Sequence, residues 1–398
     1  MTSGRLVMPT RILIVGSGGR EHALAWKLAG EPGVNTVYVA PGSAGIGLEP
    51  RVVALPDVDP LDGAAVVAAA RTVAAELVVI GPEAPLAAGV ADALADAGIA
   101  VFGPSAAAAR IEASKAFCRE IAEAAGVPMA RGRAFAADAI EDARAFAAAL
   151  AADGRGLVVK ADGLAAGKGV TVCAGLDEAL AAIAALDGPL VVEERLDGPE
   201  LSCIALADGL DAIALPLARD HKRLADGDAG PNTGGMGAIS PVPNVPDDAA
   251  ESWLDGFHRP VLAELARRGT PFRGALYAGL MLTPRGPRLL EFNARFGDPE
   301  TQAIVPRLAS ALGPLLLAAA TGRLRRARVG GAAASGGLPV LPGSVVAVVL
   351  AAAGYPASPV TGSAIAGLDE APPAGRSCST RGRGATRTGR GAPAAGVS

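Results

Sequence analysis

The stretch LVVKADGLAAGKGV, residues 157–170, combines residue types that suit phosphate binding. Its glycines are Gly163, Gly167 and Gly169. Glycine lets the backbone adopt positive φ and brings N–H groups close to an anion, while Lys160 and Lys168 add positive charge on either side. The apolar residues before the loop and the Val-Thr-Val after it are typical of strands. The pattern predicts a strand, a phosphate-binding glycine loop and a second strand, with a plain glycine-rich hairpin as the alternative.

This loop does not fit the Walker A motif, which reads G-x-x-x-x-G-K-[ST] and opens a helix. Only three residues separate Gly163 from Gly167, and Gly169 stands where Ser or Thr is required. The chain then continues with strand-forming residues, so a P-loop is excluded.

A second group that could do chemistry lies in PRLLEFNARFGDPETQ, residues 287–302. In a strand, the two-residue period puts Glu291, Asn293 and Arg295 on one face. A carboxylate and an amide oxygen suit Mg²⁺, which completes its shell with phosphate and water, and Arg295 would then face the same phosphates. An exposed sheet face is the alternative.

A third group follows the strand RILIVG, where a glycine turn at residues 16–19 leads into a helix closed by Gly30. Glu21 replaces the last glycine of the dinucleotide motif G-x-G-x-x-G, and the next strand ends without an acidic residue for a ribose. An NAD site is therefore disfavoured. The helix N-terminus and Arg20 suit a single phosphate, although a simple tight turn would also explain the glycines. Glu83 follows a further strand at its carboxyl end, where parallel sheets bind ligands.

The elements that carry these groups belong to a chain of 398 residues that is 51% hydrophobic and 3% aromatic, with a formal charge of -4. This composition predicts two or three soluble domains. No apolar run reaches the ~18 residues of a membrane span, and no signal peptide is recognised, so we expect a cytoplasmic protein without a membrane partner. Four dispersed cysteines and three histidines indicate chemistry based on charge and positioning.

Strands alternating with Ala-rich helices predict a doubly wound parallel α/β domain over residues 1–113. Ser114 is expected to cap the first helix of a second domain, residues 114–325. Within it, the polar, glycine-rich segment 219–241 is expected to be a long mobile lid loop. Residues 326–370 are expected to form a third unit, followed by a tail of different composition from residue 371.

Four motifs occur in one characteristic order: KADGLAAGKG from Lys160, the acidic strand end Glu193-Glu194, NTGGMG from Asn232 and EFNARFGDPETQ from Glu291. Together they closely resemble the phosphoribosylamine-glycine ligase family of ATP-grasp enzymes, over roughly residues 11–368. The resemblance implies an α/β protein with an N-terminal doubly wound domain, a central ATP-grasp fold of two α+β subdomains and a small, β-rich C-terminal domain that looks incomplete.

The resemblance also implies roles for individual residues. ATP would be bound by Lys115, Lys160, Gly163, Gly167, Lys168, Gly169, Glu193, Leu196, Glu200 and Met281. The substrates would be bound by Gly18, Gly19, Arg20, Glu21, Glu83, Asn232, Gly297 and Asp298. Glu291 and Asn293 would hold Mg²⁺ or Mn²⁺, and the catalytic residues would be Arg295, Lys168 and Asp220.

The implied reaction joins glycine to 5-phosphoribosylamine at the expense of ATP, through glycyl phosphate, and needs no protein nucleophile. We expect a monomer that acts on these small molecules. Another ATP-grasp ligase of purine metabolism is the alternative, although the motifs at residues 232–237 and 296–302 argue against it. A nicotinamide oxidoreductase is disfavoured by Glu21, and a nucleic-acid role, suggested only by the basic tail, is not expected.

The tail from residue 371 is rich in Arg, Gly and Ala and has no periodic apolar pattern. The family is expected to continue here with a Val-Phe-His-Ala-Gly-Thr stretch. Codons read one frame later through Ser377 to Arg383 permit that whole stretch. We therefore expect the tail to be the product of a frameshift, in the gene or in its sequence, and to be disordered.

Overall fold

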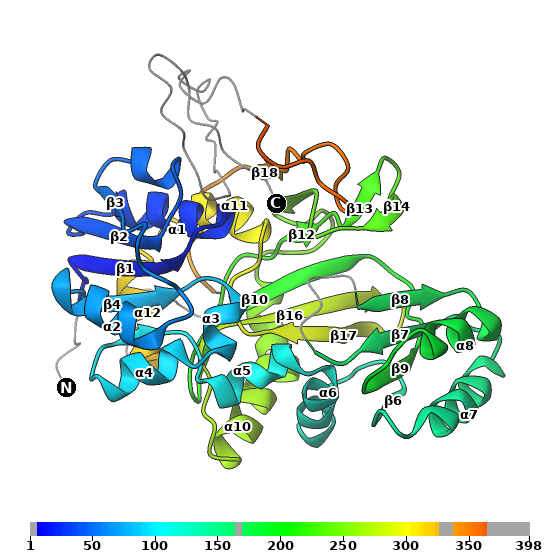
Figure 1. The fold of residues 1–398 in the computed structure, drawn as a ribbon. Helices are drawn as coiled ribbons and strands as arrows, with labels where there is room; N and C mark the ends of the chain where they lie inside the picture. Colours follow the sequence, from blue (N-terminus) through cyan, green and yellow to red (C-terminus); the bar gives the residue numbers. More distant parts are fainter. Residues whose placement is uncertain (1–5, 164–168, 326–336, 364–398) are drawn as a thin grey trace.

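The structure, a computed structural model, describes residues 6–163, 169–325 and 337–363. The chain begins with a sheet of five parallel strands in the order β3-β2-β1-β4-β5 (Figure 1). Its strands are β1 (Arg11–Gly16), β2 (Thr36–Pro41), β3 (Val52–Ala54), β4 (Leu77–Ile80) and β5 (Val101–Phe102). The connecting helices are α1 (Gly19–Ala29), η1 (Ile46–Leu48), α2 (Gly63–Thr72), α3 (Glu83–Ala87), α4 (Val90–Asp96) and α5 (Ala106–Ala113). The predicted parallel α/β unit is present.

The second sheet is antiparallel, in the order β11-β10-β16-β17. Its strands are β10 (Glu200–Asp208), β11 (Ala212–Ala214), β16 (Arg273–Thr283) and β17 (Gly286–Asn293). β16 and β17 form a hairpin. Every residue of β10 after Glu200 is buried, as in a strand covered on both faces.

Two apolar clusters each run through both of these sheets. One contains Leu13 with Cys203, and the other contains Ile12 with Ile204, so successive residues of β1 and of β10 face different clusters. Phe102 of β5 also packs against Phe296, with ring centroids 5.6 Å apart. The parallel sheet and the second sheet therefore share their core, and the domain limit expected near residue 113 stays a prediction.

A third sheet, β6-β9-β7-β8, has an apolar cluster of its own. Its elements are β6 (Gly132–Phe135), α7 (Ile140–Ala151), β7 (Leu157–Ala161), β8 (Val170–Cys173), α8 (Leu176–Ala184) and β9 (Leu190–Glu194). β7 and β8 pair antiparallel on either side of the glycine loop, so the two predicted strands are confirmed, whereas residues 164–168 lie outside the described residues. Ser114 caps α6 (Lys115–Ala124) by accepting from Phe117 N at 3.1 Å.

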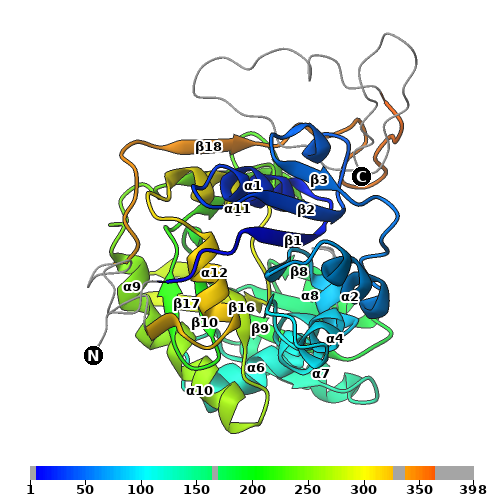
Figure 2. The ribbon, with the colours of Figure 1, turned by 90° about the vertical axis from the view of Figure 1, so that its left-hand side faces the viewer.

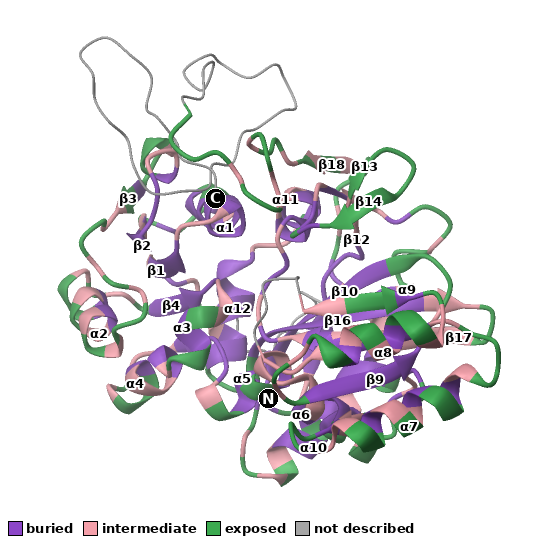
Figure 3. Cartoon of the chain, turned by 45° about the vertical axis from the view of Figure 1, so that its right-hand side comes forward, coloured by how far each residue is buried: buried purple, intermediate pink, exposed green. Residues whose placement is uncertain are grey.

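The long loop expected at residues 219–241 is instead folded into two short β ladders. β12 (Arg219–Asp220) pairs with β15 (Gly237–Ser240), and β13 (Arg223–Ala225) pairs with β14 (Ala229–Asn232). The inner hairpin turns at Gly227 (φ 70°) and Asp228 (φ 57°), the two positive φ angles that a tight hairpin turn requires. The expectation of a structureless loop was wrong because this turn signal was read as loop composition. Figure 3 shows the inner hairpin exposed beside the buried central strands.

The remaining described elements are α9 (Ala249–Trp253), η2 (Leu254–His258), α10 (Arg259–Arg267), α11 (Glu300–Ile304), η3 (Val305–Arg307), α12 (Gly313–Ala320) and β18 (Val345–Val348). Among them, α12 is almost wholly buried and lies in the middle of the molecule (Figure 2). β18 lies at the edge of the sheet β12-β15-β18 and leaves Val346, Val348 and Leu350 exposed. The predicted tail lies outside the described residues. No described helix is long and apolar enough to cross a membrane.

Candidate active site

Lys160, at the end of β7, lies in a buried charged pair with Glu193 of β9. Its Nζ is 2.7 Å from Glu193 Oε2 and donates to Leu290 O of β17 at 2.9 Å. Burial lowers the pKa of Lys160, but the adjacent Glu193 more than compensates, so the net pKa is raised and the ammonium stays charged. This lysine therefore links the third sheet to the second at the place where the sequence predicts ATP.

Arg119 of α6 holds the other oxygen of the same carboxylate. Its Nη1 is 2.9 Å from Glu193 Oε1, and its Nη2 donates to Ala130 O. The sequence analysis missed Arg119, although its position four residues after Lys115 puts both on one side of α6. Glu193 is thus fixed between two cations, which orients it for a hydrogen-bonding ligand.

Lys115 begins α6 and faces the glycine loop. Its Nζ donates to Gly163 O at 2.5 Å, and its backbone N–H donates to Asp162 Oδ1 at 2.6 Å. Ser114 Oγ donates to the second oxygen of Asp162 at 3.0 Å. Asp162, which the sequence analysis missed, therefore ties the start of the glycine loop to a helix N-terminus. Gly167 and Lys168 lie outside the described residues.

Glu200 and Met281 are paired neighbours on β10 and β16. Met281 is buried, whereas Glu200 is exposed and its Oε2 is 3.2 Å from Lys222 Nζ. Leu196 follows β9 and lines a cavity of about 380 Å³. The other residues of that cavity are Met129, Arg131, Asp153, Arg155, Glu194, Arg285 and Arg288. The predicted adenine and ribose residues therefore lie along the seam between the second and third sheets.

Glu291 and Asn293 lie at the end of strand β17, on one face as predicted. Asn293 Nδ2 donates to Glu291 Oε1 at 3.5 Å, and rotation of the amide would present its oxygen in the same place. Burial raises the pKa of Glu291, but Lys222 and Lys160 lower it more, so the net pKa is lowered and the carboxylate is ionised. One carboxylate and one amide oxygen fit Mg²⁺, which needs few protein ligands when phosphates supply the rest. Among the described residues no cluster of three acidic, His or Cys side chains offers a closed metal cage.

Asp220 lies in a different electrostatic setting, beside the carboxylate of Glu300. Burial, followed by the charge of Glu300, raises the pKa of Asp220 to about 8. Glu300 Oε1 accepts from Ser202 Oγ at 2.8 Å, and Ser202 Oγ is 2.8 Å from Tyr277 Oη. Asp220 Oδ1 lies where a Cβ on Gly235 would meet it at 2.8 Å, so the NTGGMG segment covers it directly. Asn232, the first residue of this segment, is exposed at the end of β14.

The N-terminus of α1 faces the segment after β17. A Cβ on Gly18 or Gly19 would lie 3.6 or 3.5 Å from the carboxylate of Asp298, and Gln302 Nε2 donates to Asp298 Oδ1 at 2.7 Å. Gly297 packs against Glu300, where a Cβ would meet Oε2 at 2.4 Å. The glycine turn of the first sheet and the GDPETQ motif therefore form one surface.

Arg20 and Glu83 meet Arg295 at the same junction. Glu83 Oε2 is 3.5 Å from Arg20 Nη2 and 3.3 Å from Arg295 Nε. Both arginines also donate to Phe296 O. Arg295 lies beyond the end of β17 at Asn293, and so it faces this junction rather than continuing the face of Glu291.

Glu21 lies in the first turn of α1, and its side chain packs against Gly16 at the end of β1 and Gly81 after β4. It is buried, its Oε2 accepts from Gly18 N at 2.5 Å, and its Oε1 is 3.0 Å from Arg20 Nε. A Cβ on Gly81 would collide with it at 2.0 Å. Glu21 therefore shapes the turn and orients Arg20 from below.

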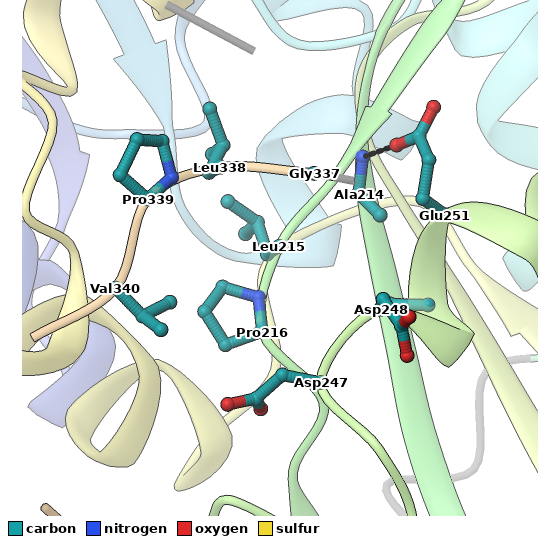
Figure 4. A pocket seen from close by; sticks show the side chains of 11 residues that line it. Ala214, Leu215, Pro216, Asp247, Asp248, Glu251, Gly337, Leu338, Pro339 and Val340 are labelled. Carbon is teal, nitrogen blue, oxygen red and sulfur yellow. Dashed lines mark hydrogen bonds between the residues drawn. The ribbon is translucent and has the colours of Figure 1, made fainter. Parts of the chain in front are cut away.

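A separate cavity of about 520 Å³ contains none of the predicted site residues (Figure 4). It is lined by Ala214, Leu215, Pro216, Asp247, Asp248, Ala250, Glu251, Gly337, Leu338, Pro339 and Val340. In this cavity Glu251 accepts from Ala214 N at 3.4 Å. The chemistry-bearing groups converge elsewhere, at the seam of the three sheets.

Comparison with known proteins bears on this convergence. Residues 10–112 match the N domain of phosphoribosylglycinamide synthetase, and residues 113–301 match its ATP-grasp (A) domain. A phosphoribosylamine-glycine ligase of Streptomyces coelicolor is 51% identical over 90% of this chain and 82% of its own. The chain belongs to the phosphoribosylglycinamide synthetase family.

Other relatives agree with this assignment. The ligase of Leifsonia xyli is 50% identical over 91% of this chain and 84% of its own. The crystal structure of the Thermotoga maritima ligase matches with a TM-score of 0.69 and 34% identity, over 88% of this chain and 83% of that one. A biotin carboxylase domain from Hydrogenobacter thermophilus matches with a TM-score of 0.61 at 18% identity, over 85% of this chain and 74% of that one, which shows the shared fold alone. The predicted fold and enzyme class, an ATP-dependent carbon-nitrogen ligase of purine biosynthesis, are confirmed.

Proposed function

We propose that this chain joins glycine to 5-phosphoribosylamine, with ATP converted to ADP and phosphate. The carboxylate of glycine attacks the γ-phosphate to give glycyl phosphate and ADP. The amine of phosphoribosylamine then attacks the acyl carbon, a proton leaves the amine, and phosphate departs. The observation that carries the proposal is that Lys115 of α6 and Lys160 of β7 both lie close enough to Glu291 of β17 to lower its pKa, in a chain of this family.

The nucleotide lies between the second and third sheets in this proposal. Lys115 and Lys160 neutralise its phosphates, and the loop that begins at Gly163 covers them together with Gly167, Lys168 and Gly169. Glu193, fixed by Arg119 and Lys160, accepts from the adenine amino group, while Leu196 and Met281 contact the ring. Glu200 accepts from the ribose hydroxyls, a contact for which its exposed position at the end of β10 is suited.

Glu291 and Asn293 would hold a divalent cation, Mg²⁺ or Mn²⁺, with phosphate oxygens and water completing its shell. When bound, the cation supplies charge compensation for the transferring phosphoryl group. The protein's own contribution is the ionised Glu291, whose pKa is kept low despite burial by Lys222 and Lys160.

Phosphoribosylamine binds at the N-terminus of α1. Its phosphate lies against the N-terminal turn of α1 at Gly18 and Gly19, with Arg20 and Arg295 alongside. Asp298 and Glu83 are placed to orient the ribose hydroxyls or the amine. Glycine then lies between this site and Glu291, near Asp220 and the segment from Asn232 to Gly237, where a carboxyl group can meet its amine.

Coupled measurement of ADP release tests the assignment. ADP should form only when glycine and phosphoribosylamine are both present with Mg-ATP. ADP release that is supported by formate or bicarbonate in place of glycine would favour another ATP-grasp ligase instead. We also propose that the protein is a cytoplasmic monomer. Light scattering of the purified chain tests whether it is monomeric.

The proposed phosphoribosylamine site at the N-terminus of α1, the acceptor site, is tested by the variant Arg20→Ala. Loss of one charged phosphate contact should raise KM for phosphoribosylamine about tenfold, as expected for a charge-assisted hydrogen bond worth ~1.5 kcal/mol. KM for ATP should change by less than about twofold. The matched control is Arg144→Ala, which removes an exposed arginine paired only with Glu141 on α7. A larger effect on ATP than on phosphoribosylamine would contradict this placement.

A further inference from the structure

Glu112, near the end of α5, joins two parts of the site that are distant in sequence. Its Oε1 is 3.0 Å from Arg295 Nη2, and its Oε2 accepts from Ala294 N at 2.7 Å. Only 9% of the side chain is exposed. One carboxylate thus fixes both the backbone and the side chain of the segment that follows β17.

The position of Glu112 along the chain gives these contacts their significance. Ser114, two residues later, ends α5 and caps α6, and Lys115 is the first residue of α6. Both are held by Asp162 at the start of the glycine loop. The short junction from Glu112 to Lys115 therefore contacts the nucleotide loop on one side and the arginine of the acceptor site on the other.

Arg295 depends on its neighbours for its orientation. Glu112 contacts Nη2, Glu83 contacts Nε, and Phe296 O accepts from Nη1. A guanidinium group has five N–H donors, so these three contacts leave donors free for an anionic ligand but fix the plane in which they point. Glu83 is the first residue of α3, which follows β4 of the first sheet, and Glu112 contacts the same guanidinium from α5.

A purely stabilising role would be a weak explanation for this buried carboxylate. Buried ion pairs add little to stability because desolvation offsets the attraction between the charges. Burial raises the pKa of Glu112, and Arg295 only partly offsets this, so the site keeps the carboxylate at an electrostatic cost. Such a cost is expected where a fixed geometry is needed.

We propose that Glu112 is a positioning residue that ties the α5–α6 junction, and with it Lys115, to Arg295, and so orients Arg295 toward phosphoribosylamine. This inference rests on the proposed function for the identity of the ligand. The contacts themselves predict a second consequence that does not depend on the reaction, namely that Glu112 restrains residues 294–298.

Glu112→Gln is the sharpest variant because glutamine still accepts from Ala294 N but no longer pairs with the guanidinium. KM for phosphoribosylamine should rise about tenfold, while the Kd for Mg-ADP, measured by calorimetry, should stay within about twofold. Glu112→Asp keeps the charge but shortens the reach, and should give an intermediate KM. The control is Glu120→Gln on α6, which removes an exposed carboxylate paired with Arg268 and should change neither value.

A double-mutant cycle with Arg295→Lys separates positioning from general stability. The effects of the two substitutions on KM should be strongly non-additive, because Arg295→Lys removes the guanidinium group that Glu112→Gln leaves misoriented. Additive effects, an unchanged KM in Glu112→Gln, or equal increases in KM for ATP and phosphoribosylamine would overturn the inference.

Hydrogen exchange decides the inference even if the proposed reaction fails. In Glu112→Ala, which removes the acceptor of Ala294 N as well as the ion pair with Arg295, amide exchange over residues 294–298 should accelerate about tenfold, while exchange over β2 should not change. If wild type binds Mg-ADP but shows no turnover with phosphoribosylamine, the proposed function fails and exchange alone tests the restraint. Unchanged exchange in residues 294–298 would overturn the restraint.

Discussion

Two carboxyl groups of the site, Glu291 on β17 and Asp220 on β12, show how opposite surroundings give opposite charge states. Lys222 and Lys160 keep the pKa of Glu291 below its ordinary value despite burial. Burial and Glu300 raise the pKa of Asp220 to about 8. Near neutral pH the first group is therefore an anion and the second is mostly protonated.

This difference indicates how the site divides its work. A carboxylate surrounded by cations can accept a divalent ion together with phosphates, because the charges then balance. A carboxyl group that shares its surroundings with another acid holds a proton, which it can release when a cationic group such as an amine arrives. The two regions thus suit phosphoryl transfer and amine handling respectively.

Removing Glu291 should have the largest effect. Glu291→Ala should reduce glycine-dependent ADP formation by ~10²–10³ at saturating Mg²⁺, because one preorganised electrostatic contact to the transferring group is lost. Circular dichroism should stay close to wild type, whereas the unfolding midpoint should fall, because Lys222 and Lys160 lose a compensating anion. Glu141→Ala, on the exposed face of α7, is the matched control. Activity within a few-fold of wild type would remove Glu291 from the metal site.

Lys160 tests the cationic side of the comparison. Lys160→Met leaves Glu193 buried with Arg119 as its remaining close cation, and breaking a buried pair in this way costs about 3–5 kcal/mol. Urea unfolding should show this loss, and the Kd for Mg-ADP should rise at least tenfold. The double variant Lys160→Met/Glu193→Gln should recover part of the stability but not the nucleotide affinity. Recovery of both would mean that Lys160 serves the fold alone.

The fold, and the secondary structure around the proposed nucleotide site, could largely be predicted from the sequence because their signals are local. The strands around the glycine loop, the cap at Ser114 and the β16–β17 hairpin each follow from neighbouring residues. The segment 219–241 was misread because a three-residue turn, with positive φ at Gly227 and Asp228, decides it.

The partners Glu112, Arg119 and Asp162 could not be predicted in the same way. Each acts on a group that is remote in the chain: Glu112 lies 182 residues from Ala294 and Arg119 lies 74 from Glu193. Only the packed sheets bring these groups together. A pattern in one sequence reports local periodicity, and it carries no information about which distant charge will be buried against which.

The smallest expected effect concerns Asp220 and is seen in stability rather than turnover. An unfolded aspartate has a pKa of about 3.9, whereas the folded value is about 8. Between these values the folded state holds a proton that the unfolded state has released, so the free energy of unfolding falls as pH rises through this window. Below the lower value both states are protonated and the term disappears.

Asp220→Asn removes this titration and should therefore gain stability relative to wild type as pH increases. Urea unfolding at pH 5, 7 and 9 should give a difference between variant and wild type that grows with pH, by ~1 kcal/mol or more across the range, since one unit of pKa shift corresponds to ~1.4 kcal/mol. Glu300→Gln should produce a smaller change of the same sign, because it removes the neighbouring charge but leaves Asp220 buried. Asp138→Asn, at an exposed position before α7, is the control and should track wild type at every pH. Parallel curves for Asp220→Asn and wild type would show that Asp220 is ionised like Glu291, and the contrast between the two regions would then be lost.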